Sequence, residues 1–171
     1  MPYDVMIDIE TMGTSPRAAI LSIGAVRFDI ATGVLGQELE VNVDLQSCVA
    51  AGMVIEPDTV LWWLRQDEAA REAATSGRTP IETALDRLTL VVNGACHIWA
   101  NSPSFDLIIL RTAYVMAGLR SAPWKYWEER DCRTLLDIAG IRIPRNEVKH
   151  TALEDAKAQA VAVSGAWAIL R

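Results

Sequence analysis

Apolar positions in the first quarter of the chain form runs of strand length, separated by short turns. Residues 3–14 begin with a hydrophobic run, 19–29 mix β-branched and small residues, and 38–44 alternate apolar and polar positions. Each pattern is typical of a β-strand. Turn-forming residues at 13–17 and 31–36 keep the connections short, and strands joined in this way pair antiparallel. The sequence therefore predicts a three-stranded antiparallel meander.

Beyond residue 57 the apolar positions recur at helical spacing, with two short strands between the helices. Residues 96–100 predict a strand, and 130–140 predict a short strand that runs into a short helix. The expected helices cover residues 58–66, 67–75, 79–93, 104–118 and 150–170. A meander followed by alternating helices and strands indicates an α/β fold in which helices pack on a mixed sheet.

Four of the expected helices have recognisable start signals, and Pro57 and Asp58 mark the first of them. Residues 79–82 and 151–154 each match a capping box, so the last helix is expected to start at Thr151. Ser104 is a candidate cap for the helix that follows it. These signals predict which residues lie on the loops and which lie on the helices.

The composition is that of a globular protein with a sizeable core. Of its 171 residues, 51% are hydrophobic and 22% are charged, so we expect a single domain over residues 1–171. No apolar run approaches the ~18 residues of a spanning helix, and the N-terminus lacks the features of a signal peptide. We therefore expect a cytoplasmic protein without a membrane partner. Cys48, Cys96 and Cys132 are far apart, which argues against a disulfide framework and against a CxxC zinc site.

The net charge of −6 limits how a polyanion would bind. Proteins that contact many phosphates usually carry a basic patch, and this sequence has no long basic run. If the substrate is a nucleic acid, we expect the protein to hold a short stretch of it. Divalent cations are then expected to offset the acidic charge of the site.

Two carboxylates interrupt the first hydrophobic run. Asp8 and Glu10 are two positions apart, so along a strand both side chains project to the same face. Carboxylates placed so closely repel one another unless a cation lies between them. The pattern alone also fits a solvated strand end, because such triplets arise in many proteins. Partners elsewhere in the chain decide between the two interpretations.

The segment after the expected strand at 96–100 supplies the next polar groups. Asp106 opens the following helix, where the helix dipole favours an acid. Alternatively, Asp106 lies at the C-terminal edge of the strand, where open α/β sheets place their ligands. Asn101, just past the strand end, either satisfies its own turn or hydrogen-bonds a sugar or phosphate.

His150 and Asp155 flank the start of the last helix. His150 lies just before the helix, on a loop, whereas Asp155 lies one turn inside it. The other histidine, His97, falls within an expected buried strand and is interpreted as structural. Four carboxylates and a histidine in this order indicate a two-metal hydrolytic site, in which two ions clamp an in-line displacement at phosphorus. Oxygen ligands favour Mg²⁺ or Mn²⁺, and histidine suits the role of general base.

These motifs resemble those of the DEDD superfamily of 3′-5′ exonucleases, which share a ribonuclease H-like fold. The matching segments are DIET at 8–11, NSPSFD at 101–106 and HTALEDA at 150–156. A histidine five residues before the last aspartate marks the DEDDh branch of that superfamily, and this sequence resembles that branch in having one. The resemblance implies a mixed five-stranded sheet, a meander followed by parallel strands, with helices on its faces.

Further segments resemble the exodeoxyribonuclease VIII-like proteins and the adenylate-preferring exoribonucleases of that branch. These segments are TMGTSPRAAILSIGAV at 11–26, DTVLWWLRQDEAAR at 58–71 and RDCRTLLDIA at 130–139. The resemblance implies that two Mg²⁺ ions serve catalysis by Asp8, Glu10, Asp106, His150 and Asp155. It also implies that the terminal nucleotide is held by Thr11, Met12 and Gly13. By analogy with relatives that dimerise, a homodimer is expected.

Trp62 and Trp63 are adjacent, so one helix cannot turn both toward the same core. One of them is a candidate to stack on a base, a contact worth ~1–3 kcal/mol. Alternatively, both tryptophans cover edges of the sheet.

The sequence thus predicts a metal-dependent 3′-5′ exonuclease that releases nucleoside 5′-monophosphates from single-stranded nucleic acid. Asp8, Glu10, Asp106 and Asp155 hold the metals, and His150 activates water. Single-stranded DNA is the favoured substrate, and short or adenylate-rich RNA is the first alternative. A non-catalytic nucleic-acid-binding module is the alternative of a different class, and the intact motifs argue against it.

Overall fold

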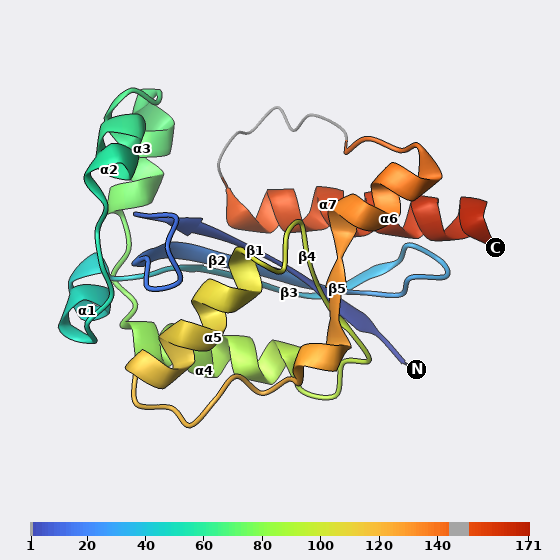
Figure 1. The fold of residues 1–171 in the computed structure, drawn as a ribbon, viewed down its shortest axis with the longest axis horizontal. Coiled ribbons are helices and arrows are strands. Elements are labelled where there is room, and N and C mark those ends of the chain that lie inside the picture. Colours follow the sequence, from blue (N-terminus) through green and yellow to red (C-terminus); the bar gives the residue numbers. More distant parts are fainter. Residues whose placement is uncertain (1, 144–150) are drawn as a thin grey trace.

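Five strands form one mixed sheet in the order β3-β2-β1-β4-β5 (Figure 1). The computed structural model describes residues 2–143 and 151–171. The strands are β1 (Asp4–Thr11), β2 (Ile20–Phe28), β3 (Leu35–Asn42), β4 (Ile98–Ala100) and β5 (Glu129–Asp131). β1, β2 and β3 pair antiparallel, whereas β4 and β5 continue the sheet parallel to β1. The predicted meander and the predicted mixed five-stranded sheet are both confirmed.

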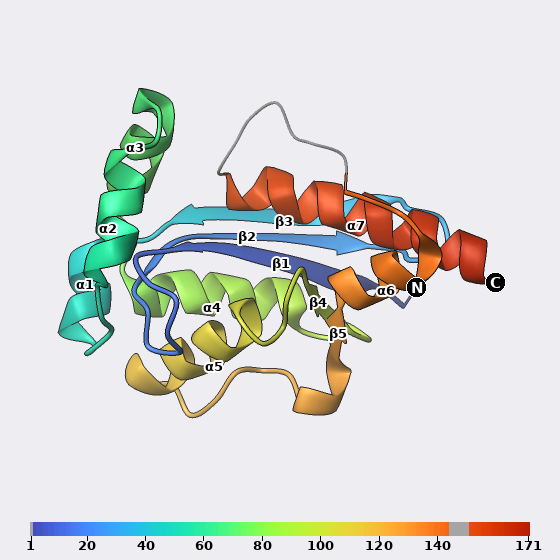
Figure 2. The ribbon, with the colours of Figure 1, turned by 45° about the horizontal axis from the view of Figure 1, so that its top comes forward.

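Helices cover both faces of this sheet (Figure 2). One face packs against α4 (Ile81–Val92) and α5 (Asp106–Met116), and the other against α6 (Cys132–Ala139) and α7 (Ala152–Leu170). Three further helices lie beyond one end of the sheet, and a short 3₁₀ turn precedes β5 (Figure 1). These are α1 (Leu45–Ala50), α2 (Pro57–Leu64), α3 (Glu68–Thr75) and η1 (Tyr126–Glu128). None of the helices in the described ranges combines the length and hydrophobicity that membrane crossing requires.

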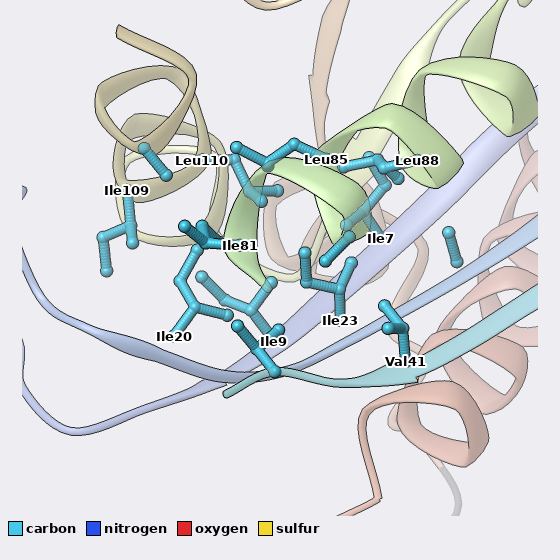
Figure 3. Packing of buried hydrophobic residues seen from close by; sticks show 14 of the residues in the cluster. Ile7, Ile9, Ile20, Ile23, Val41, Ile81, Leu85, Leu88, Ile109 and Leu110 are labelled. Atoms are coloured by element: carbon cyan, nitrogen blue, oxygen red, sulfur yellow. The ribbon is translucent and has the colours of Figure 1, made fainter. Parts of the chain in front are cut away.

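The alternation along β1 divides its residues between the two faces. Val5, Ile7 and Ile9 are buried under α4 and α5, in the cluster that Figure 3 shows. Met6 belongs to the opposite cluster, with the alanines of α7. Burial of each of these aliphatic side chains contributes about 1.5–3 kcal/mol. The odd positions thus anchor the strand, and the even positions, which include Asp8 and Glu10, face α7.

α7 lies unusually close to the sheet at its first turn. A β-carbon on Gly24 would lie 2.1 Å from the carbonyl carbon of Ala152 and 2.2 Å from the backbone nitrogen of Leu153. Only glycine therefore fits at this position of β2. Gly24 is also the residue that pairs with Asp8 in the sheet register. The close approach consequently brings the N-terminal turn of α7 over the strand position beside Asp8.

The helix start signals are only partly confirmed. α4 begins at Ile81, and the backbone N–H of Ile81 donates to Ser47 Oγ at 2.9 Å rather than to a threonine cap. The capping box at 79–82 is wrong because Thr79 forms a bridge with Val43, and the resulting backbone bonds hold it beside the sheet. Ser104 does not cap α5, whose N-cap residue is Phe105 without a side-chain cap bond.

At α7 the predicted start is confirmed and the predicted capping box is not. Thr151 is the N-cap residue, but its side chain makes no cap bond, and Thr151 Oγ1 is buried without a hydrogen-bond partner among the described residues. Glu154 instead pairs with Lys157 at 3.1 Å. The glutamate of the expected box is therefore engaged on the outer side of the helix.

β4 is shorter than the strand predicted at 96–100, because pairing with β1 begins only at Ile98. Cys96 is exposed, and His97 is half-buried rather than enclosed in the sheet. His97 Nδ1 lies 3.1 Å from Asp4 Oδ1, so its observed contact is structural. The helix α1 and the 3₁₀ turn η1 were not predicted, since both are only one or two turns long.

Candidate active site

β1 and α7 bring three carboxylates into one cluster. Oxygen atoms of Asp8, Glu10 and Asp155 all lie within 4.8 Å of one another. Asp8 and Glu10 come from alternate positions of β1, and Asp155 comes from the first turn of α7. The cluster exists because the even face of β1 is the face that α7 covers. The alternative interpretation of Asp8 and Glu10, a solvated strand end, does not describe this arrangement.

The fourth predicted acid lines the same hollow. Asp106 is the first residue of α5, directly beyond the C-terminal end of β4, and only 5% of it is exposed. Its Oδ2 accepts a hydrogen bond of 3.4 Å from the backbone N–H of Ser102. The hollow has a volume of about 440 Å³. It is lined by Asp8, Ile9, Glu10, Asn101, Ser102, Phe105, Asp106, Arg133 and Asp155.

Crowding and burial make the site electrostatically costly for ionised acids. Burial raises the pKa of Asp8 well above its usual range, and the charge of Asp106 adds to this. Burial and the charges of Asp155 and Asp106 raise the pKa of Glu10 to about 7. Burial also raises the pKa of Asp106 to about 6, although backbone hydrogen bonds and Arg133 oppose the change. A cation bound among these carboxylates would relieve the repulsion.

The donor set of this hollow fits hard divalent cations. The four acids supply carboxylate oxygens, and no cysteine or histidine among the described residues lines the hollow. Asn101 Oδ1 is buried and has no hydrogen-bond partner in the described part of the chain. That oxygen therefore does not satisfy its own turn. Mg²⁺ and Mn²⁺ are the ions that prefer such oxygen-rich surroundings.

A second hollow of about 420 Å³ adjoins the acids and is partly aromatic. Its lining includes Glu10, Thr11, Gly13, Trp62 and Trp63. Trp63 is buried, and its Nε1 donates to the backbone oxygen of Thr11 at 3.0 Å. Trp62 is 42% exposed, and its ring meets that of Trp63 edge-on with centroids 5.0 Å apart. The prediction that one helix cannot bury both tryptophans is confirmed.

The turn after Glu10 is bound to the start of α2 by Glu56. The backbone N–H groups of Thr14 and Ser15 donate to the Glu56 carboxylate at 2.9 and 3.0 Å. Hydrogen bonds from these two residues lower the pKa of Glu56 to about 2. A β-carbon on Gly13 would lie 2.8 Å from this carboxyl group, so a larger residue here would displace the Glu56 side chain. Met12 points elsewhere, into the core and the margin of a separate hollow.

Sequence reasoning missed three side chains that shape the site. Arg133 lines the acid hollow, Glu56 holds the turn, and Gln159 donates from Nε2 to Asp8 Oδ1 at 2.8 Å. Arg133 lies in the segment RDCRTLLDIA, and Gln159 follows Asp155 by one helical turn. Spacing was the available signal for Gln159. No local pattern marked Glu56, whose role depends on a tertiary contact.

The candidate general base, His150, lies outside the described residues. Of the residues that the sequence proposed for catalysis, the described ones are therefore the four acids, and all four line one hollow. A larger hollow of about 680 Å³ lies at the opposite end of β1, beside Tyr3 and Asp4. It contains none of the four acids, so size does not identify the reactive end of the sheet.

Comparison with known proteins shows that this chain is similar to nucleases. The chain is 24% identical over 162 residues to the exodeoxyribonuclease of Enterobacteria phage T4, covering 79% of this chain and 71% of the phage protein. Exonuclease I of E. coli, solved in complex with a dT13 oligonucleotide, is 19% identical with a TM-score of 0.64. The match covers 99% of this chain and 41% of that one.

A moderately thermophilic exonuclease I from Methylocaldum szegediense has a TM-score of 0.68 at 19% identity, over 96% of this chain and 40% of that chain. The protein thus spans about two fifths of the length of these enzymes. The likeness confirms the ribonuclease H-like fold. A model of the 3′-5′ exoribonuclease Rv2179c-like domain matches residues 3–167, nearly the whole chain. The expected DEDD-type resemblance is therefore confirmed, and the chain belongs to the Rv2179c-like family of 3′-5′ exoribonuclease domains.

Proposed function

We propose that this protein is a metal-dependent exonuclease that removes nucleoside 5′-monophosphates one at a time from the 3′ end of single-stranded nucleic acid. One observation carries the proposal: Asp8, Glu10, Asp106 and Asp155, from three elements, line a single hollow. These carboxylates would hold two Mg²⁺ or Mn²⁺ ions. When bound, such ions neutralise the phosphate, lower the pKa of water and stabilise the leaving oxygen.

We assign His150 as the general base that accepts the proton of the attacking water. In the sequence, His150 directly precedes Thr151, the N-cap residue of α7, and lies five residues before Asp155. Histidine titrates near neutral pH, so it accepts a proton at the pH of the reaction and releases it again. The assignment rests on sequence position, and it is tested by substitution below.

The adjoining hollow is proposed to seat the terminal nucleotide. Thr11 and Gly13 form one wall, and the ring of Trp62 offers an aromatic surface for a base. Asn101 and Arg133 line the acid hollow, where they can meet the sugar and the phosphate. Met12 and Trp63 are buried in the core, and they support the nucleotide site by holding this turn against the core.

RNA is the substrate that we propose, which departs from the preference for DNA drawn from the sequence. The family that covers residues 3–167 is one of exoribonuclease domains, and this supports RNA. DNA remains the second candidate, because the phage T4 relative is an exodeoxyribonuclease and an exonuclease I was solved with dT13. The two candidates share the site and differ only at the sugar, where a 2′-hydroxyl contact decides.

The test is a time course on single-stranded RNA and DNA of identical sequence, labelled at the 5′ or the 3′ end. With Mg²⁺ or Mn²⁺, we expect a one-nucleotide ladder from the 5′-labelled RNA and immediate release of the 3′ label. Chelator should stop both. Release of the label from the 5′ end, or full activity in chelator, would contradict the proposal. Faster cleavage of DNA than of RNA would favour the second candidate.

Three variants complete this experiment. Asp8→Asn should abolish cleavage, whereas Asp137→Asn, an identical change at an exposed position of α6, should leave it unchanged. His150→Ala should lose most of the rate and still take up Mn²⁺ in calorimetry. A wild-type protein that binds oligonucleotide but takes up no Mn²⁺ would instead be a non-catalytic binding module.

A further inference from the structure

Gln159 is a polar side chain buried where the rest of the helix face is apolar. It lies on α7 between the fully buried Ala156 and Ala160, and only 4% of it is exposed. Its Nε2 donates to Asp8 Oδ1 at 2.8 Å. Its Oε1 is buried without a partner among the described residues. An amide in this position costs free energy that an apolar side chain would not, so packing alone does not explain it.

The surroundings of Asp8 show what the amide contributes. Among the described residues, the charged groups that act on Asp8 are Asp106, Glu10 and Asp155, and all three repel its ionised form. Gln159 favours that form through its hydrogen bond, and it is the side chain in the described ranges that does so. A lysine or arginine here would also do so, but its positive charge would compete with a cation for the carboxylates. A neutral donor holds the carboxylate without occupying the cation's place.

The distance between the two side chains is fixed by the backbone. Asp8 pairs with Gly24 in the sheet, and Gly24 is the point at which the first turn of α7 meets β2. Gln159 lies one helical turn beyond Asp155, on the same side of the helix. The contact that aligns Asp155 with the cluster therefore also aligns Gln159 with Asp8.

We infer that Gln159 is a positioning residue, which fixes the rotation of the Asp8 carboxylate so that its second oxygen is presented to the divalent cation. The inference rests on the proposed function, because it assigns a cation to the acid cluster. Groups that hydrogen-bond a metal ligand in this way change metal affinity or activity by about 10–100-fold when they are removed. Gln159 does not line the hollow proposed for the nucleotide, so its effect should be confined to the metal.

The test compares Mn²⁺ binding by metal-stripped wild type and Gln159→Leu in calorimetry, together with the Mn²⁺ dependence of the cleavage rate. We expect the affinity for Mn²⁺ to fall about tenfold or more, while KM for the oligonucleotide at saturating Mn²⁺ stays within about twofold. Wild-type Mn²⁺ affinity in the leucine variant would overturn the inference. If leucine prevents folding, Gln159→Met, which keeps the length of the side chain, replaces it under the same criteria.

Ser164→Ala is the matched control. Ser164 is a second buried polar residue of α7, and its Oγ also has no partner among the described residues, but it does not contact Asp8. Its removal should leave Mn²⁺ affinity unchanged. A loss equal to that of Gln159→Leu would assign the effect to helix packing and refute a role for Gln159. If wild type itself takes up no Mn²⁺, the proposed function fails; wild-type uptake with an unaltered leucine variant overturns only the positioning role.

Discussion

The four acids of the site repel one another when they are ionised, and the fold holds them together against that repulsion. Val5, Ile7 and Ile9 anchor β1 on one face, which leaves Asp8 and Glu10 no freedom to separate on the other. The acids were predictable because strand alternation and motif spacing are local properties of the sequence. The roles of Gln159 and Glu56 were not, since each depends on a tertiary contact between segments far apart in the chain.

Asp8→Asn should abolish catalysis and yet stabilise the metal-free protein at pH 8. Burial and the neighbouring acids raise the folded-state pKa of Asp8 well above its usual range, and they raise that of Glu10 to about 7. A raised carboxyl pKa means that the folded state holds its proton more tightly than the unfolded state. Its stabilising contribution is full below the unfolded pKa, about 4, and is lost as pH rises through the folded pKa. Asparagine carries no charge and removes this loss.

Thermal unfolding in chelator at pH 5 and pH 8 measures the effect. We expect the midpoint temperature of wild type to be lower at pH 8 than at pH 5. At pH 8 the midpoint temperature of Asp8→Asn should exceed that of wild type by about 2–4 °C, or about 1 kcal/mol. Added Mn²⁺ should raise the wild-type midpoint far more than that of the variant. A variant less stable than wild type at pH 8 would contradict the electrostatic interpretation of the site.

At the scale of elements, the site depends on how closely α7 approaches β2. The sequence predicted that α7 starts at Thr151 from an expected capping box; the start is confirmed, although the box does not form. It predicted the start of α4 wrongly, because the bridge between Thr79 and Val43 overrides the local capping signal. Gly24 is a second position whose role a local sequence signal cannot predict. Its importance follows from the backbone of a helix more than 120 residues away, which no local pattern contains.

Gly24→Ala should displace the N-terminal turn of α7. The added methyl group would lie 2.1 Å from the carbonyl carbon of Ala152, so the helix must shift or the strand must bend. Overpacking of this kind costs about 1–3 kcal/mol, and Asp155 and Gln159 would move away from Asp8. Thermal unfolding and Mn²⁺ calorimetry should both show the loss.

Gly36→Ala in β3 is the control for this substitution. Its β-carbon would lie 3.5 Å from Arg27 Cβ, an ordinary contact, so stability and Mn²⁺ affinity should stay near wild type. Equal losses of stability and Mn²⁺ affinity in the two variants would mean that strand glycines matter in general, and that the contact between α7 and Gly24 has no special role.

At the scale of the molecule, the charge distribution favours contacts with only a few nucleotides of the substrate. The chain carries a net charge of −6, and Arg133 is the basic side chain that lines the acid hollow among the described residues. The sheet topology was predictable because short connections enforce the meander. The homodimer expected by analogy stays a prediction, which sedimentation velocity would check. No sequence pattern identified the surface that would form it.

Cleavage should therefore depend weakly on salt and on substrate length. Each phosphate contact to a single strand contributes about −0.7 to the slope of log affinity against log salt concentration, so about two or three contacts predict a slope of −2 or shallower. Oligonucleotides of about five nucleotides should be cleaved nearly as efficiently as those of about twenty. Measurements of kcat/KM across salt and length check this. A slope near −5, or a strong gain with length, would reveal an extended binding surface that the charge distribution does not suggest.

The contact between Gln159 and Asp8 joins residues 151 positions apart, and Asp155 comes almost as late in the chain. A ribosome that is still making this protein has already released β1 with its two acids and α5 with Asp106, yet Asp155 does not exist until α7 has been translated, and it joins the other acids only when α7 has docked on Gly24. We therefore expect an unfinished chain to be inert toward the messenger RNA beside it. The order of synthesis itself would then protect the messenger RNA, because the proposed nuclease activity arises only after α7 has been translated.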